Sequence, residues 1–474
     1  MKDHCCAPKG DFDLAVIGAG SAGFSAAITA AEAGKRVALI GFGTIGGTCV
    51  NVGCVPSKAM IRAAEAVHGG ASAARFPGIA PCEHSVDWAA VVQGTADLVA
   101  EMRQKKYIDL LPAYDTITYI EEGPARLLEG GVAVGGRVIA APRVLIATGA
   151  RPQMPAIDGI DGVDVLDSTA LLTLPARPES IIVLGGGYIG CELAQMASRL
   201  GVRVTLVTRS RLLPKAEPEV SAALTEALKA EGIAVETGLN YLSVTEDGGG
   251  VALTIARGGQ SETLTAERLV ATTGRVANTE GLGLAELGIE RDARGALRVG
   301  PDMATTRPGI WAAGDVTDRD QFVYMAAYGA KVAINNAFGL EPMRYDNAAM
   351  PWVVFTDPQV AGVGLSEAQA RAAGHEVKTS VITLDNLPRA AAARDTRGVI
   401  KLVADAKTDR LLGGQIVAPE GSDTIQTLAM ALRFGVTAKA LGETIFPYLT
   451  TVEGLKLAAQ TFDKDVAKLS CCAG

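Results

Sequence analysis

Two cysteines, Cys49 and Cys54, stand in a run of small and apolar residues over positions 46–58. The four residues between them carry no charge, and Gly53 lets the backbone bring both sulfur atoms close to a flat partner. A cysteine pair that opens and closes exchanges two electrons with a flavin or with another dithiol. We therefore interpret this pair as redox-active.

Two other interpretations of the pair are a structural disulfide and half of a zinc site. A structural disulfide is uncommon in a cytosolic protein, which is the location that we expect. A zinc site needs two more Cys or His ligands at a finger-like spacing, and none lies nearby in the sequence. Redox chemistry is favoured over both alternatives, which stay open at this point.

The residues before the cysteines predict a dinucleotide-binding fold. An apolar strand over residues 11–17 leads into Gly18, Gly20 and Gly23, which have the spacing G-x-G-x-x-G, and an alanine-rich helix follows. The first glycine permits the turn, and the second lets a pyrophosphate approach the backbone. The third lets the helix pack closely on the strand. The helix amino end then faces the phosphates.

The next strand, expected over residues 36–40, leads directly to the cysteine pair. It ends at Gly41, where such folds place an acidic residue for the ribose hydroxyls, so one expected cofactor contact is weakened. A helix beginning near Pro56 would direct its positive amino end towards Cys54 or a flavin and favour a thiolate. Connectivity therefore brings the thiols to the edge of the nucleotide site.

A second fingerprint follows a strand expected over residues 180–184. It consists of Gly185, Gly187 and Gly190, and the helix after it carries Glu192. Because each fingerprint binds one dinucleotide, two fingerprints predict two dinucleotides.

The residues after the second glycine fingerprint indicate which nicotinamide cofactor binds there. Its strand over residues 203–207 is followed by Arg209 and Arg211, where an NAD-selective site would have an acid. Because arginines suit a 2′-phosphate, we predict NADPH. The alternative is that both are surface arginines at a strand end.

Three further strand ends predict contacts with a cofactor. Residues 143–149 and 269–274 are apolar strands that run into small-residue turns, and such turns can close over a cofactor. Residues 310–315 end in an acid that can accept hydrogen bonds from a ribitol or polyol hydroxyl, although it can also be an ordinary helix N-cap. The cofactor-binding residues that we predict in these turns and beside the cysteines are Gly47, Thr48, Ala147, Thr148, Gly149, Gly274 and Asp315.

The composition is that of an α/β enzyme. The 474 residues exceed one core, so two to four domains are expected. The net charge of -8 gives no basic surface for nucleic acid or an anionic membrane. No apolar run approaches the roughly 18 residues that span a bilayer. We expect a cytoplasmic protein with small-molecule partners.

The cysteine pair, the two fingerprints and the Ala-Gly-Asp motif at Asp315 occur in an order that resembles the pyridine nucleotide disulfide oxidoreductases. The resemblance covers nearly the whole chain. It is strongest to the mercury-reducing members, through residues 46–58, 446–450, 452–456 and 470–474. It implies FAD and NADPH as cofactors, thiol-bound Hg(II) as substrate, and a homodimer whose third domain forms the interface.

The resemblance predicts an α/β fold with two Rossmann-like domains and an α+β carboxyl-terminal dimerisation domain. We expect residues 1–151 and 277–345 to bind FAD, 152–276 to bind NADPH, and 346–474 to form the interface. Within the first part, residues 72–119 are expected to be mainly helical. The last part is expected to consist of strands with two helices.

The resemblance also implies roles for single residues. By this match Cys54 lies against the FAD, Cys49 is its exposed partner, and both cysteines bind the metal. Lys58 pairs with Glu192, and Tyr188 covers the nicotinamide pocket. Without the motif, Lys58 would be an ordinary solvated helix lysine.

The carboxyl-terminal part distinguishes among family members on chemical grounds. Glutathione and lipoamide enzymes carry His-Pro in the segment that matches Tyr448-Leu449, because the departing thiolate needs a proton donor. This chain has no histidine after His375. A phenol with a pKa of about 10 is a poor acid near neutrality, so disulfide turnover should be slow. We assign catalytic roles to Tyr448 and Glu453.

Cys471 and Cys472 offer two adjacent thiolates near the carboxyl terminus. Soft thiolates prefer soft metals, and linear coordination of Hg(II) by two thiolates is what the resemblance supplies. We predict that this pair binds and delivers the metal. The alternatives are a frayed end without a role and an intersubunit disulfide. Whether Cys5 and Cys6 collect metal stays open.

The resemblance implies that electrons pass from NADPH through FAD to the cysteine pair, and then to Hg(II) that the opposite subunit's tail has delivered. One alternative is a thioredoxin-reductase-like enzyme, in which the tail relays electrons to a protein disulfide; that type keeps the His-Pro base. Another is a flavoprotein that sequesters Hg(II) without turnover, which only Gly41 favours.

Overall fold

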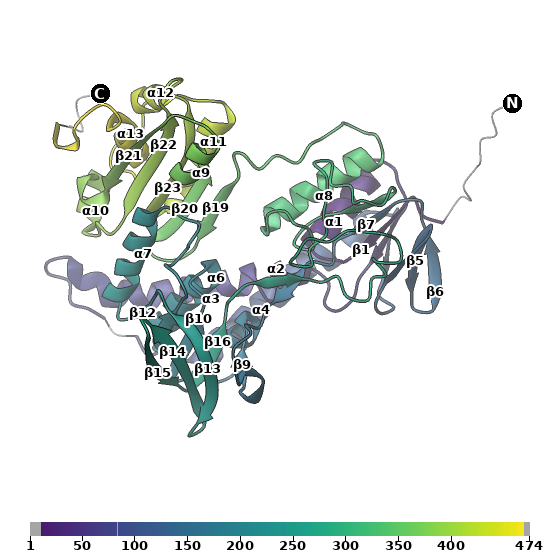
Figure 1. Ribbon diagram of the computed structural model, residues 1–474, viewed down its shortest axis with the longest axis horizontal. Coiled ribbons are helices and arrows are strands. Elements are labelled where there is room, and N and C mark those ends of the chain that lie inside the picture. Colours follow the sequence, from purple (N-terminus) through teal and green to yellow (C-terminus); the bar gives the residue numbers. More distant parts are fainter. Residues whose placement is uncertain (1–10, 83, 469–474) are drawn as a thin grey trace. The chain divides into compact units, whose positions relative to one another are not determined.

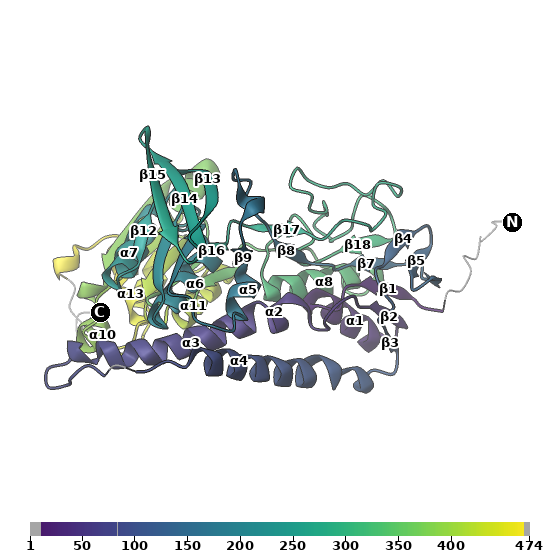
Figure 2. The ribbon, with the colours of Figure 1, turned by 90° about the horizontal axis from the view of Figure 1, so that it is seen from below.

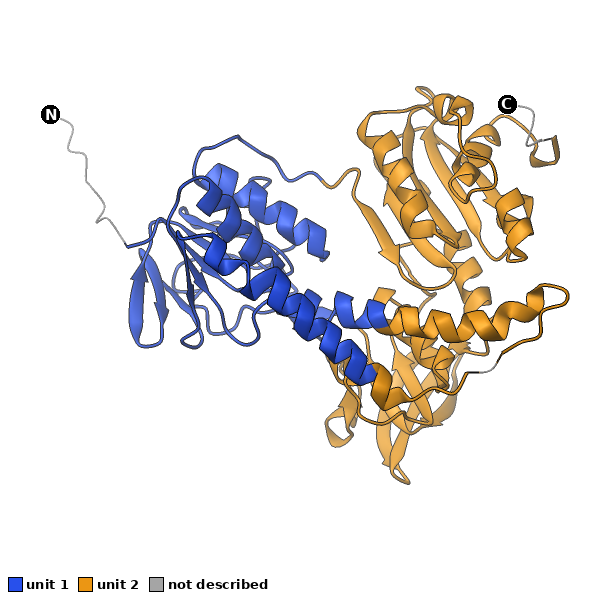
Figure 3. Cartoon of the chain, turned by 180° about the vertical axis from the view of Figure 1, so that it is seen from behind, with its two compact units in different colours: residues 1–59, 92–153, 274–346 blue, residues 60–91, 154–273, 347–474 orange. Residues whose placement is uncertain are grey.

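The computed structural model describes residues 11–82 and 84–468. Cys5, Cys6, Cys471 and Cys472 lie outside the described residues. The chain forms two compact units (Figure 3), which consist of residues 1–59, 92–153 and 274–346 for unit 1, and residues 60–91, 154–273 and 347–474 for unit 2. The finer domain limits stay predictions. No helix of the described residues is long and apolar enough to cross a membrane.

Unit 1 is built on a five-stranded parallel sheet in the order β18-β7-β1-β2-β3. The strands are β1 (Leu14–Ile17), β2 (Val37–Ile40), β3 (Ile117–Ile120), β7 (Val144–Ile146) and β18 (Ile310–Ala312). Helices α1 (Ser21–Glu32) and α8 (Val323–Ala337) pack against each other beside this sheet (Figures 1 and 2). Every residue of β1 and β2 is buried, which explains their uninterrupted apolar sequences.

Residues 72–119 are mainly helical, as expected, but the strand β3 (Ile117–Ile120) at their end was missed. The helix α4 (Trp88–Arg103) lies in this range, but β3 follows it and pairs with β2, with Tyr119 opposite Leu39. The strand has four residues, and its partner lies far away in the sequence. Its four residues, Ile-Thr-Tyr-Ile, all favour strands, so this strand could have been recognised locally; only its partner could not.

The remaining strands of unit 1 are short. Small antiparallel sheets are formed by β4 (Arg126–Leu128), β5 (Gly131–Val134) and β6 (Arg137–Ala140), and by β8 (Ala150–Pro152) with β17 (Arg275–Ala277). The helices α2 (Gly47–Asn51) and α3 (Cys54–Ala71) follow β2, and α3 belongs to unit 1 up to residue 59. The dithiol segment thus comes directly after β2.

Unit 2 contains a second five-stranded parallel sheet, in the order β12-β11-β10-β16-β9. The strands are β9 (Val165–Leu166), β10 (Ser180–Leu184), β11 (Arg203–Val207), β12 (Ala234–Glu236) and β16 (Arg268–Ala271); the helices are α5 (Ser168–Leu172), α6 (Tyr188–Arg199) and α7 (Pro218–Ala230). An antiparallel sheet of β13 (Asn240–Asp247), β14 (Gly250–Arg257) and β15 (Gln260–Ala266) accompanies them. The predicted repeat of the nucleotide fold is therefore present.

The carboxyl-terminal part of unit 2 has an antiparallel sheet in the order β19-β20-β23-β22-β21. The strands are β19 (Pro351–Val354), β20 (Gln359–Gly364), β21 (Val377–Thr383), β22 (Val399–Asp405) and β23 (Leu411–Ala418). The helices are α9 (Glu367–Ala372), α10 (Pro388–Ala393), α11 (Gly421–Arg433), α12 (Ala438–Glu443) and α13 (Glu453–Gln460), so the expected two helices were too few. Helix α7 of the nucleotide fold also packs on β22 and β23.

Candidate active site

The first glycine turn has the geometry that a bound pyrophosphate requires. Gly18 has a φ of +116°, and a Cβ atom there would lie 2.2 Å from the Ala147 carbonyl oxygen. A Cβ atom on Gly23 would lie 1.8 Å from the Gly18 oxygen. Only glycine fits these positions, and α1 begins directly after the turn at Ser21. These residues fit a dinucleotide at the helix amino end.

The dithiol segment contacts this glycine turn. The Gly46 N–H group donates a hydrogen bond of 2.8 Å to the Ala19 carbonyl oxygen. A Cβ atom on Gly47 would lie 2.7 Å from the Gly20 Cα atom, so a side chain at this position would collide with the turn. The structure therefore places the segment that carries Cys49 beside the expected pyrophosphate position.

Cys49 and Cys54 lie together, as the redox interpretation requires. Cys49 is on α2, and Cys54 is the first residue of α3, slightly before the predicted helix start at Pro56. A hydrogen bond between the two side chains raises the pKa of the Cys49 thiol, burial adds to this, and the charge of Lys58 opposes it. Cys49 is half-buried and Cys54 is exposed; which of them lies against the FAD stays a prediction.

The alternative that Cys49 and Cys54 form half of a zinc site has no support in the described part of the chain. Within residues 11–82 and 84–468 no group of three His, Cys, Asp or Glu side chains is placed to hold a metal ion. The two thiols thus lack the further ligands that a zinc site would need there.

The dithiol loop is held by a hydrogen-bond pair that sequence reasoning missed. The Asn51 side-chain amide donates to the carbonyl oxygens of Ile45 and Gly47, at 2.9 Å each. Arg103 on α4 donates to the Asn51 side-chain oxygen at 3.0 Å. This arrangement fixes both ends of the turn before the first cysteine.

Tyr107 is a second residue beside the dithiol that sequence reasoning missed. Its ring packs edge-on against Phe24 of α1, with ring centroids 4.8 Å apart. Burial raises the pKa of the Tyr107 phenol, a hydrogen bond with Ser21 opposes this, and the charges of Cys49 and Cys54 add to the increase. The phenol therefore stays protonated between the glycine turn and the thiols.

The predicted turn at residues 147–149 is closed by reciprocal hydrogen bonds. The Thr148 hydroxyl donates to the Asn278 carbonyl oxygen at 2.7 Å, and the Asn278 side-chain amide donates to the Thr148 carbonyl oxygen at 2.9 Å. The turn is thereby joined to the chain that returns from unit 2 at residue 274.

Asp315 is not the ordinary N-cap that we considered as an alternative. Strand β18 ends at Ala312, α8 begins at Val323, and its N-cap is Phe322. Burial raises the pKa of the Asp315 carboxyl group, and the charge of Arg275, whose Nε lies 3.8 Å away, opposes this shift. A partly buried acid in a turn is available to a hydroxyl donor.

The second glycine turn in unit 2 repeats the first. Gly185 has a φ of +110°, and a Cβ atom on Gly190 would lie 1.9 Å from the Gly185 oxygen. Gly187 precedes α6 and faces open space, since no atom lies within 4 Å of a Cβ built there. These features fit a second dinucleotide.

The two arginines after β11 differ in their surroundings. Arg211 donates hydrogen bonds to the carbonyl oxygens of Pro214, at 3.1 Å, and Ala216, at 2.6 Å. Arg209 is exposed, and its charge lowers the pKa of the nearby Tyr241, which burial nevertheless raises to about 12. Backbone carbonyl groups therefore hold Arg211, whereas Arg209 lies exposed at the strand end.

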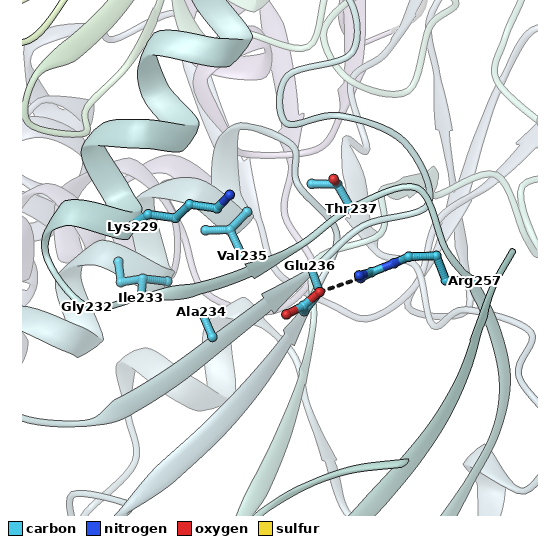
Figure 4. A pocket seen from close by; sticks show the side chains of 8 residues that line it. All are labelled: Lys229, Gly232, Ile233, Ala234, Val235, Glu236, Thr237 and Arg257. Carbon is cyan, nitrogen blue, oxygen red and sulfur yellow. Dashed lines mark hydrogen bonds and ion pairs between the residues drawn. The ribbon is translucent and has the colours of Figure 1, made fainter. Parts of the chain in front are cut away.

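A hollow of about 520 Å³ lies along β12 and contains none of the predicted site residues (Figure 4). Its lining comes from the end of α7, from β12 and from Arg257. Arg257 forms an ion pair with Glu236, the acid at the end of β12. This ion pair neutralises the charge of Glu236, which lies beside the last residue of β11.

Tyr188 and Glu192 both face the carboxyl-terminal part of unit 2. The Tyr188 ring stacks on Trp352, with centroids 5.5 Å apart, and burial raises the pKa of its phenol. The buried Glu192 carboxylate accepts a hydrogen bond of 2.9 Å from the Phe355 N–H group. The predicted pair of Glu192 with Lys58 joins different units and stays a prediction.

Tyr448 lies on a turn that Glu453 supports. Tyr448 is exposed, whereas Glu453 is buried, with 5% of its surface accessible. The Leu449 N–H group, at a residue with a φ of +62°, donates to the Glu453 carboxylate at 3.2 Å. The buried acid thus holds the backbone next to the phenol, although it does not contact the phenol through that bond.

The chain is similar to known proteins in sequence and in fold. The family model for pyridine nucleotide-disulphide oxidoreductases matches residues 12–336, and the model for the dimerisation domain of that family matches residues 350–459. A mercuric reductase from Streptomyces lividans is 45% identical over 98% of both chains. One from Bacillus cereus is 46% identical over 98% of this chain and 73% of its own length.

Solved structures agree with the family models. The HOCl-induced flavoprotein disulfide reductase RclA from Escherichia coli, in a Cu(II) complex, is 28% identical, with a TM-score of 0.84 over 95% of this chain and 99% of its own. LpdA from Mycobacterium tuberculosis has the same TM-score and coverage at 27% identity. The chain belongs to the pyridine nucleotide-disulphide oxidoreductase family and, within it, is a relative of the mercuric reductases.

Proposed function

We propose that this chain is an NADPH-dependent flavoenzyme that reduces thiol-bound Hg(II) to Hg(0). The observation that carries the proposal is the contact between Gly47 and Gly20, which sets the Cys49 and Cys54 thiols beside the first dinucleotide turn. The relatives named mercuric reductases support the choice of substrate.

The residues present fit FAD in the first fold and NADPH in the second. The first turn, the closed turn at Thr148 and the partly buried Asp315 offer groups that suit a pyrophosphate and a polyol. When bound, FAD supplies two-electron transfer between the nicotinamide and a dithiol or a metal. Tyr188, packed on Trp352, is the residue that we assign to the nicotinamide pocket.

The side chains of Cys49 and Cys54 bind the substrate. Each thiol loses its proton and replaces one small thiol on Hg(II), so that two sulfur ligands remain and two small thiols leave. Two electrons from NADPH then convert Hg(II) to Hg(0), which no longer binds thiolates. The overall reaction consumes NADPH, one proton and Hg(SR)₂, and it gives NADP⁺, Hg(0) and two RSH.

We infer that the chain works as a cytoplasmic homodimer, with the domain limits given above. Support comes from the dimerisation-domain match and from exposed apolar side chains in residues 430–449, among them Phe434 and Ile445. Tyr448 lies in this region, and we assign to it a contact with the metal. Cys471 and Cys472, outside the described residues, are assigned to metal delivery.

The test is NADPH oxidation by the full chain with Hg(II) and excess small thiol. Oxidised glutathione and thioredoxin serve as competing substrates, because no histidine that could protonate a leaving thiolate follows His375. We expect turnover with Hg(II) and slow turnover with both disulfides. Absence of metal-dependent NADPH oxidation would refute the proposal, and rapid thioredoxin reduction would favour the relay alternative.

A further experiment tests the delivery role of the tail. Changing Cys471 and Cys472 together to alanine should reduce turnover of bulky Hg(II) dithiolates, because the substrate must then reach Cys49 and Cys54 directly. Reduction of the flavin by NADPH should be unchanged. Equal turnover of wild type and variant would show that the tail is dispensable.

A further inference from the structure

Gly41 stands at the position where nucleotide folds of this kind carry an acid for the adenosine ribose. It follows β2 directly and is buried. The last residue of β2, Ile40, accepts a hydrogen bond of 2.8 Å from the N–H group of Gly18 in the first glycine turn. Gly41 therefore lies beside the dinucleotide turn but offers no side chain to a ribose.

The phenol of Tyr119 occupies the space that a side chain at position 41 would need. A Cβ atom on Gly41 would lie 2.3 Å from the Tyr119 hydroxyl oxygen and 2.8 Å from two of its ring carbons. Tyr119 reaches this place because β3 pairs with β2 in a register that sets Tyr119 opposite Leu39, two residues before Gly41. Side chains two residues apart on a strand share a face.

The Tyr119 hydroxyl is buried and has no hydrogen-bond partner among the described residues. Such a group loses its bonds to water and gains none from the protein, which costs stability. Buried phenols usually find a partner. Tyr119 keeps this polar group beside a nucleotide turn, although phenylalanine would pack equally well there. The hydroxyl therefore points to a hydrogen-bond partner that the ligand supplies.

We propose that the Tyr119 hydroxyl replaces the missing acid at position 41 and donates a hydrogen bond to a ribose hydroxyl of the adenosine half of FAD. The inference rests on the proposed binding of FAD to the first fold. Because the tyrosine ring is only partly buried, a small shift of the ring exposes the oxygen to the ribose. The glycine and the tyrosine form a matched pair, since a side chain at position 41 would exclude the phenol.

The chemistry of the phenol suits this role. Burial, together with the charge of Glu121, raises the pKa of Tyr119, so the group keeps its proton and donates it. A neutral phenol forms a weaker hydrogen bond than an ionised carboxylate. We therefore expect the adenosine end of FAD to be held less tightly than in a fold that has the acid.

The first experiment measures the affinity of the full chain, stripped of FAD, for added FAD through quenching of flavin fluorescence. Tyr119→Phe should weaken binding about threefold to tenfold, because one hydrogen bond is lost. The same variant should leave the melting temperature of the FAD-free chain unchanged or higher, since it removes an unpaired buried hydroxyl. The control is Tyr114→Phe, outside β3, which should alter FAD affinity less than twofold.

Two ligand analogues and two further variants sharpen the test. The two analogues are FAD without the adenosine 2′-hydroxyl and FAD without the 3′-hydroxyl. The analogue that lacks the partner of Tyr119 should bind with equal affinity to the wild type and to Tyr119→Phe. Gly41→Glu alone should weaken FAD binding through collision with the phenol. The double variant Gly41→Glu with Tyr119→Ala should bind FAD more tightly than Gly41→Glu alone.

The outcomes separate this inference from the proposed function. If the unaltered chain does not bind FAD, the proposed function fails. If the chain binds FAD and Tyr119→Phe binds it equally well, the hydroxyl has no role and the inference is overturned. Equal loss of affinity for FAD and for both deoxy analogues would overturn it too, because the effect would not pass through a ribose hydroxyl.

Discussion

Arg209 and Arg211 follow the same strand, but the protein uses them differently. Two backbone carbonyl groups already accept hydrogen bonds from Arg211, which folds its guanidinium back onto residues 214–216. Arg209 is exposed at the strand end, and the neighbouring acid Glu236 is neutralised by Arg257. A 2′-phosphate would therefore interact mainly with Arg209.

Arg209→Ala should lower the preference for NADPH over NADH about tenfold or more, as the ratio of the two kcat/KM values. The reason is the loss of one charge-assisted phosphate contact of about 1.5–3 kcal/mol. Arg211→Ala is the matched control and should change the ratio less. An unaltered ratio in both variants would contradict the assignment of these arginines to the phosphate.

Glu453 acts on the backbone next to the predicted catalytic phenol. Glu453→Ala should remove the acceptor of the Leu449 N–H group and lower the free energy of unfolding by about 1.5–3 kcal/mol, because this hydrogen bond has a charged partner. Glu453→Gln keeps an oxygen acceptor and should cost less. Urea unfolding followed by circular dichroism compares the two, and equal losses would show that the carboxylate does not support the turn.

At the scale of elements, α7 and the carboxyl-terminal sheet meet through a buried polar cluster. Lys401 of β22, with 2% of its surface accessible, contacts the carboxylates of Glu217, Glu219 and Glu367 at 2.9–3.1 Å. Gln415, opposite it on β23, accepts a hydrogen bond from the Glu217 N–H group at 2.7 Å. One ammonium group thus balances carboxylates from two helices.

Lys401→Met should destabilise the protein by about 3–5 kcal/mol, because it leaves the buried Glu217 carboxylate without its cation. The control is Lys407→Met, which breaks an exposed ion pair with Glu376 and should cost about 0–1 kcal/mol. Urea unfolding measures both. Similar small losses would mean that packing of α7, and not the ion cluster, joins these elements.

Several elements could be predicted from the sequence because their information is local. Strands β10 and β11 have the predicted limits, and β1 and β2 differ only at their starts. Strand β3 was missed although its residues Ile-Thr-Tyr-Ile favour a strand, because the helical segments before it dominate the region. Lys401 was missed because a lysine in a strand normally marks a solvent face, and its acidic partners come from α7 and α9.

At the scale of the whole chain, an ion network in unit 2 predicts a dependence of stability on pH. Buried Arg199 binds Glu231 and Asp357, and Arg397 binds the same Glu231. His68 lies 3.9 Å from Glu231. Burial and the charge of Arg199 lower the pKa of His68. Burial would raise the pKa of Glu231, but its hydrogen bond and charge interaction with Arg199 lower it.

Both shifts make the protein less stable in acid. Below about pH 6.5 the unfolded His68 binds a proton that the folded residue resists, so stability falls. The contribution of Glu231 is present above its unfolded pKa of about 4.3 and is lost as the pH falls through the lower folded value.

The melting temperature should therefore decrease between about pH 7.5 and pH 5. His68→Gln should reduce this decrease, whereas the control His84→Gln, at an exposed residue, should not. Differential scanning fluorimetry over this range provides the measurement. Parallel curves for wild type and His68→Gln would contradict the assignment.

For the candidate site too, short segments of sequence predicted some residues, whereas residues from distant elements were missed. The spacing of Cys49 and Cys54 and both glycine fingerprints lie in short segments, so their placement was predicted. Tyr107 and Tyr119 reach the site from other elements, and no short pattern marks them. The deviation at Gly41 was visible in the sequence, but only the β2–β3 register shows what fills its place.

The packing of α7 on β22 and β23 bears on how the chain can be divided in the laboratory. A fragment that stops near residue 346 would keep Glu217 and Glu219 and lose the lysine and glutamine that bind them. A fragment of residues 347–474 would present Lys401 and its sheet face to water. The boundary between the two family-model matches therefore does not separate parts that fold independently. We expect truncated forms to aggregate or be degraded, whereas the intact chain remains stable.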